Sequence, residues 1–115
     1  MADYLESFLE GKNVGAYCRA ADKYQLEEKM NIVNSFAAKH NIEIDTTYFF
    51  RETTDQKDDN EQLRSAAESS DMFQVLLIPS YHSISMHTRE YEVIKRLFEK
   101  IGVYIIVIEG YDAVE

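Results

Sequence analysis

Four short apolar segments, separated by longer stretches with helical periodicity, constrain the fold of this chain more than any other feature. They read NVGAYC (13–18), IEIDTTYFF (42–50), FQVLLIP (73–79) and VYIIVI (103–108). Strands that alternate with helices form βαβ units, whose right-handed crossovers build a parallel sheet. We therefore predict an α/β fold with three layers, in which a mostly parallel sheet of four to five strands has helices on both faces.

The stretches between these segments carry helix signals. Asp22, with Gln25 three residues later, fits a capping pattern, and apolar residues then recur at helical spacing up to His40. Similar spacing predicts helices around Leu63 and between 91 and 101. We expect a single domain over 1–115, with an amphipathic helix within 1–11 and an α/β core over 13–112.

Charge and composition exclude several classes of protein. The formal net charge is −9, and no basic cluster stands out, so we expect DNA binding to be weak or absent in this chain alone. The apolar runs are far shorter than the ~20 residues of a membrane span. The acidic N-terminus does not resemble a secretory signal. Cys18 is the only cysteine, which excludes an internal disulfide and agrees with a cytoplasmic protein.

In a parallel sheet, binding sites form at the carboxyl ends of the strands. Here those ends fall at Arg19, at Phe50 and Arg51, at 79–85 and at Glu109. Arg19 carries a permanent charge, for which two interpretations remain: an anion site, or an ion pair with Glu109 or Asp112.

The order and spacing of these segments resemble the catalytic domain of the serine recombinases (the resolvase/invertase family) over roughly residues 13–112. In that family the first strand ends in Tyr-x-Arg-x-Ser, with Gln four residues after the serine. This chain reads Tyr17-Cys18-Arg19-Ala20-Ala21, with Gln25 at that offset. The resemblance continues through EIDTTYFFRETTDQKDDNEQL, FQVLLIP and LFEKIGVYIIVIEGYD. It implies the resolvase-like fold and a relation to DNA recombination.

The chain departs from the family at nearly every catalytic position. The family's serine attacks a DNA phosphodiester, and that position is Ala21, which has no nucleophilic atom. Arg19 and Gln25 remain as candidate anion-binding residues, although Gln25 also fits a helix cap. At the other aligned positions, different residues stand where the family has acidic, arginine or proline side chains. These residues are Phe50, Asn60, Glu61, Tyr81, His82 and Ser85.

These departures predict an inactive recombinase domain that persists as a regulatory or protein-interaction module, with a protein partner or a second copy of itself. In the family a long dimerisation helix and a DNA-reading domain follow the last strand, whereas this chain ends at Glu115. We expect either that these parts are missing or that the chain is a piece of a longer recombinase-related protein.

The sequence also permits other chemistries. A hydrolase or phosphotransferase using Ser80, His82 and Ser83 with Arg19 is the alternative function. We expect no metal and no cofactor, because the histidines and the acidic loop lack ligand spacing. A flavodoxin-like or receiver-like domain is disfavoured, since no Ser/Thr-Gly phosphate loop follows the first strand. Cys18 is predicted to be buried, with a reactive thiol as its alternative.

Overall fold

The computed structural model describes residues 8–53, 61–83 and 88–109. Four strands form one sheet in the order β2-β1-β3-β4, and every pair of neighbours is parallel. The elements, in chain order, are β1 (Val14–Ala20), α2 (Lys23–Lys39), β2 (Ile44–Thr53), α3 (Glu61–Glu68), β3 (Val75–Ile78), the 3-10 turn η1 (Tyr81–Ser83), α4 (Thr88–Lys100) and β4 (Tyr104–Val107). The predicted α/β fold and four-stranded parallel sheet are confirmed.

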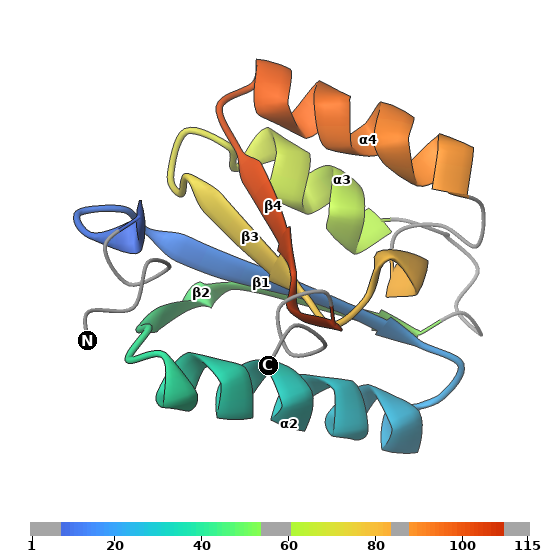
Figure 1. Ribbon diagram of the computed structural model, residues 1–115. Coiled ribbons are helices and arrows are strands. Elements are labelled where there is room, and N and C mark those ends of the chain that lie inside the picture. The colour runs from blue at the N-terminus through green and yellow to red at the C-terminus, as the bar shows by residue number, and fades with distance from the viewer. Residues whose placement is uncertain (1–7, 54–60, 84–87, 110–115) are drawn as a thin grey trace.

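Helices cover both faces of the sheet: α2 lies on one face, and α3 and α4 lie on the other (Figure 1). Each face has its own hydrophobic core. On the α2 side, Val33 and Phe36 pack with Cys18 of β1 and Leu77 of β3. The opposite core includes Phe73, together with Phe98 of α4 and Leu63 of α3. Strands buried on both faces explain why β3 reads as an unbroken apolar run.

The ends of α2 follow from its sequence. Asp22 is the N-cap, and its Oδ1 accepts a hydrogen bond of 2.9 Å from the backbone N–H of Gln25. At the other end His40 is the C-cap, and Asn41 has a φ of 59°, a left-handed conformation that asparagine tolerates well. The helix start predicted from Asp22 and Gln25 is therefore confirmed.

Gly15 allows β1 and β2 to approach closely. A Cβ atom on Gly15 would lie 2.8 Å from the backbone oxygen of Tyr48 on β2. The pairing of β1 with β2 is also irregular at this point, because Val14 pairs with Ile44 whereas Ala16 pairs with Phe49. A side chain at position 15 would force the two strands apart.

Most of the predicted N-terminal helix lies outside the described residues. Its last apolar residues, Phe8 and Leu9, pack against the α2-side core. The ring of Phe8 also contacts Tyr104 of β4 edge to face, with centroids 5.4 Å apart. The described part of this segment thus covers the chain's own sheet.

Candidate functional site

The carboxyl ends of all four strands lie at one edge of the sheet because every strand runs in the same direction. The order β2-β1-β3-β4 places the switch in crossover direction between β1 and β3, with α2 on one side and α3 on the other (Figure 1). Ligands of open α/β sheets bind at such a switch point. Arg19 and Ala20 end β1, Glu52 and Thr53 end β2, and Pro79 follows β3.

A buried tyrosine–carboxylate pair lies directly beside this edge. The hydroxyl of Tyr17 donates a hydrogen bond to Glu52, and the second carboxylate oxygen accepts one of 3.4 Å from the backbone N–H of Gln62. Tyr17 is fully buried and Glu52 is 3% exposed. In the sheet register, Arg19 pairs with Glu52. A buried carboxylate is stable only with such partners, so these contacts tie β1, β2 and the start of α3 together.

The surroundings of Tyr17 keep its hydroxyl protonated. Burial raises the pKa of Tyr17 well above its ordinary value, and the hydrogen bond and the negative charge of Glu52 raise it further. The positive charge of Arg19 acts in the opposite direction and lowers the pKa of Tyr17. A phenol held in this way is a hydrogen-bond donor rather than a nucleophile. The hydroxyl of Tyr17 and the carboxylate of Glu52 can therefore position the guanidinium of Arg19 at the sheet edge.

Comparison of the coordinates with solved structures finds similar domains. The C-terminal catalytic domain of ISC1926 TnpA, an IS607-like serine recombinase, is 19% identical and has a TM-score of 0.68, covering 84% of this chain and 67% of that one. The N-terminal catalytic domain of TP901-1 integrase is 14% identical, with a TM-score of 0.69 over 86% of this chain and 78% of that one.

The fold is that of a serine recombinase catalytic domain. The C-terminal catalytic domain of IS1535 TnpA, another IS607-like serine recombinase, agrees with this at 14% identity, with a TM-score of 0.64 over 84% of this chain and 70% of that one. From the sequence alone, no protein-family profile and no curated protein matches the chain. The resolvase-like fold implied by the sequence resemblance is confirmed.

Ala21 occupies the position that the resemblance assigns to the recombinase nucleophile. It lies between the end of β1 and the N-cap of α2, and its side chain is exposed at the carboxyl edge of the sheet. A methyl group there cannot attack phosphorus. The hydroxyl of Tyr17, in the pair with Glu52 described above, is buried and holds its proton.

The residues aligned with the recombinase acid and with its glutamine lie in different environments. Phe50 is 7% exposed and packs against Phe73 in the core, with ring centroids 6.0 Å apart. The carboxylate at this end of β2 belongs to Glu52, which the sequence analysis did not consider. Phe50 and Glu52 are two residues apart and share one face of the strand. Gln25 is exposed in the first turn of α2, where its backbone serves the helix cap.

The remaining aligned positions are only partly described. Asn60 and Ser85 lie outside the described residues, as does Asp112, one proposed partner of Arg19. Tyr81 begins η1, and of its side chain nothing is described. His82 is exposed in the same turn. Within the described ranges, the structure therefore brings Arg19 and Glu52 together, and Ala21 is exposed just beyond the end of β1.

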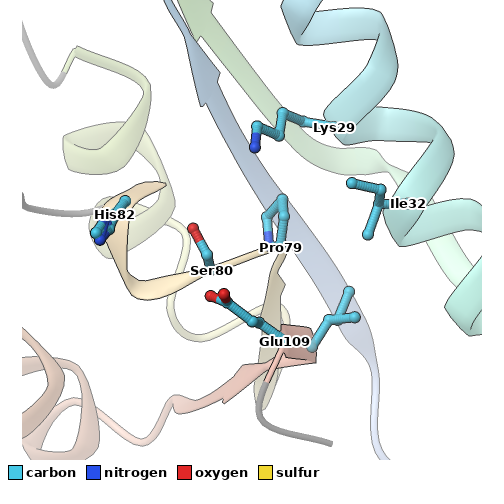
Figure 2. A pocket seen from close by; sticks show the side chains of 7 residues that line it. Lys29, Ile32, Pro79, Ser80, His82 and Glu109 are labelled. Carbon is cyan, nitrogen blue, oxygen red and sulfur yellow. The ribbon is translucent and has the colours of Figure 1, made fainter. Parts of the chain in front are cut away.

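A pocket of about 660 Å³ opens between α2 and the ends of β3 and β4. Lys29, Ser80, His82 and Glu109 supply its polar lining, and Arg19 is not among the described residues that line it. Figure 2 shows His82 set apart from Ser80 and Glu109 on the η1 turn. Ser83 is only 3% exposed. Of the residues that the alternative hydrolase would use, Ser80 and His82 line this pocket, whereas Ser83 is buried.

Burial suppresses the reactivity of Cys18. Its side chain is fully buried in β1, and this burial raises the pKa of the thiol from 9.0 to about 12, although the charges of Lys29 and Arg51 act in the opposite direction. Because the thiolate is the reactive form, Cys18 behaves as a small apolar residue.

In the three described ranges, His, Cys, Asp and Glu side chains do not gather in groups of three or more that could hold a metal ion. None of the described helices has the length and apolar character needed to cross a bilayer.

Proposed function

We propose that this chain is a serine recombinase-like domain that does not cleave DNA and serves as a regulatory, protein-binding module. The observation that carries the proposal is Ala21, exposed at the position of the recombinase nucleophile. Without a hydroxyl there, the covalent protein–DNA intermediate cannot form. A phosphoryl transition state also needs cationic side chains to stabilise its charge. Among the positions aligned with the recombinase arginines, only Arg19 is still an arginine.

The charge of the molecule supports the same proposal. With 21 acidic and 12 basic residues, the chain has a net charge of −9. Proteins that bind duplex DNA place Lys and Arg against the phosphates, and each such contact adds to a salt-dependent affinity. Long-range repulsion therefore opposes the approach of DNA to this domain.

A stripe of exposed aliphatic residues on α4 and the turn that directly follows it supports a role in protein binding. Val93, Leu97 and Ile101 follow one another at intervals of four residues, and their side chains are 53%, 55% and 44% exposed. Single exposed apolar residues are ordinary, but a contiguous row of them is typical of a contact surface. The row is symmetric about Leu97, so two α4 helices packed antiparallel would place Val93 of one copy against Ile101 of the other.

The loss of catalysis is tested by trapping covalent adducts. The protein is incubated with a labelled pool of random-sequence duplex DNA, denatured in detergent and separated on a gel. We expect no labelled protein band from the wild type or from Ala21→Ser, because the serine alone does not restore the missing cations. A band from the wild type would overturn the proposal, and a band from Ala21→Ser would show that the rest of the site still supports cleavage.

Self-association through α4 is tested by sedimentation velocity over roughly 1–200 µM protein. We expect the sedimentation coefficient of the wild type to rise with concentration, and that of Leu97→Gln to remain at the monomer value. As a matched control, Tyr24→Gln removes a different exposed apolar side chain, on α2, and should behave as the wild type does. A wild type that stays monomeric over this range would contradict a second copy as the partner of α4.

A further inference from the structure

The pocket between α2 and η1 has polar groups of both signs above an apolar lining. Lys29 and Ile32 come from α2, Pro79 and Ser80 follow β3, and Glu109 follows β4. The backbone N–H of Glu109 donates a hydrogen bond of 3.0 Å to the carbonyl of Pro79, which fixes the two strand ends relative to each other. The pocket is thus built from three separate parts of the fold.

The polar side chains converge on the same opening. Figure 2 shows the amino group of Lys29 and the carboxylate of Glu109 reaching toward Ser80 from opposite sides, with Pro79 between them. Among the described residues, no hydrogen bond or ion pair satisfies the side chains of Lys29, Ser80 or Glu109. Their hydrogen-bonding capacity therefore remains available to a bound molecule.

The lining between these groups is apolar. Ile32, the buried Pro79 and Ile108, which is 1% exposed, contribute aliphatic surface. The volume of about 660 Å³ lies within the ~300–1,000 Å³ typical of small-molecule sites. Such sites combine an apolar wall with a few placed polar groups, which is the arrangement found here.

We propose that this pocket binds a small zwitterion of the α-amino-acid type with an aliphatic side chain. The ligand's carboxylate pairs with Lys29, its ammonium group pairs with Glu109 and Ser80, and its side chain packs on Ile32 and Pro79. Glu109 and the net charge of −9 repel a purely anionic ligand, and Lys29 repels a purely cationic one. A molecule that carries both a positive and a negative charge can pair with both Glu109 and Lys29.

This inference is independent of the proposed loss of DNA cleavage. Of the described positions aligned with the recombinase site, only His82 also lines the pocket. Failure of either proposal would therefore leave the other intact.

The probe is L-leucine, compared with two analogues that each lack one charged group: 4-methylpentanoate and 3-methylbutylamine. Binding is followed by ¹H–¹⁵N NMR titration of the full chain. We expect saturable shifts at the amides of Ser80 and Glu109, with a dissociation constant on the order of 0.1–1 mM for so open a site. Each analogue should bind at least about tenfold more weakly, since it loses one charge-assisted contact.

Two variants assign the charges, and each has a control elsewhere on α2. We expect Lys29→Gln and Glu109→Gln each to weaken leucine binding about tenfold. Lys23→Gln and Glu28→Gln, at exposed positions outside the pocket, should bind as the wild type does. Glu109→Gln should also bind 4-methylpentanoate more tightly than the wild type, because the repelling carboxylate is gone. Circular dichroism verifies the fold of each variant.

Two results would overturn the proposal. One is the absence of saturable shifts up to about 20 mM leucine, a concentration well above the expected dissociation constant. The other is binding of 4-methylpentanoate by the wild type as tightly as leucine, which would make the pocket a simple anion site.

Discussion

Glu52 is the residue on which the candidate site depends most directly. Its carboxylate is buried, and it accepts hydrogen bonds from the hydroxyl of Tyr17 and the backbone of Gln62. A buried charge that loses one of its donors retains its full desolvation cost. The Tyr17–Glu52 pair therefore matters more for stability than an ordinary surface hydrogen bond would.

We predict that Tyr17→Phe lowers the free energy of unfolding by about 1–3 kcal/mol, because the phenyl ring keeps the packing but removes the donor to Glu52. Urea denaturation at pH 7 measures the change. Tyr24→Phe is the control, since Tyr24 is 75% exposed, and it should be neutral. Equal stability of Tyr17→Phe and the wild type would show that the pair contributes nothing.

The raised pKa of Cys18 predicts a loss of stability in alkali. The thiol titrates at about 9.0 in the unfolded chain and at about 12 in the folded one, so between these values the folded state binds the proton more tightly. The contribution of the protonated thiol to the free energy of unfolding is fully present below about pH 9. Above that pH, it falls by about 1.4 kcal/mol per pH unit.

Cys18→Ala should remove this slope while lowering the stability at pH 7 by about 1 kcal/mol through lost packing. Urea denaturation at several pH values between about 7.5 and 9.5 measures it, mostly below the ordinary pKa of 10.0 near which Tyr17 ionises in the unfolded chain. If the free energy of unfolding changes with pH equally in the wild type and the variant, burial does not raise the pKa of the Cys18 thiol.

At the scale of elements, the N-cap of α2 can be tested alone. Asp22→Ala removes the acceptor for the Gln25 N–H and should lower the free energy of unfolding by about 1 kcal/mol. Asp22→Asn keeps an equally good cap and should change it little. Thermal and urea unfolding of both variants provide the measurement, and an equal loss in both would point to the charge of Asp22 rather than to capping.

The elements and their order could be predicted from the sequence because each carries its own signal. The capping residue Asp22, the helical spacing that follows it and the apolar runs of β3 and β4 are local features, and all were placed correctly. The sheet also follows, since alternating strands and helices leave few other topologies.

The partner of Tyr17 could not be predicted in the same way. It depends on the register of β1 against β2, which shifts between Val14 and Ala16, and a slip of one residue would turn Glu52 to the other face. One signal was available: Glu52 is two residues from the apolar Phe50, so both share one face of the strand. The α2–η1 pocket was equally hidden, because Lys29 and Glu109 are distant in sequence and meet only in the folded chain.

For the whole molecule, the excess of acidic residues dominates long-range electrostatics. At 0.01 M ionic strength the Debye length is about 30 Å, comparable with the 45 × 30 × 28 Å extents of the domain, so the charges of the whole surface repel one another. At 0.15 M it falls to about 8 Å, and mainly close pairs still interact. The buried contact between Tyr17 and Glu52 is hardly screened in either case.

We therefore predict that added NaCl stabilises the domain, raising the free energy of unfolding by about 1 kcal/mol between 0.01 and 0.15 M, because the compact state suffers more self-repulsion than the unfolded chain. Neutralising three exposed acids (Glu27→Gln, Glu43→Gln, Asp71→Asn) changes the net charge from −9 to −6 and should reduce this response. Urea denaturation at both salt concentrations compares the two proteins. Destabilisation of the wild type by salt would contradict the prediction, because it would mean that attractive surface pairs outweigh the self-repulsion of the folded domain.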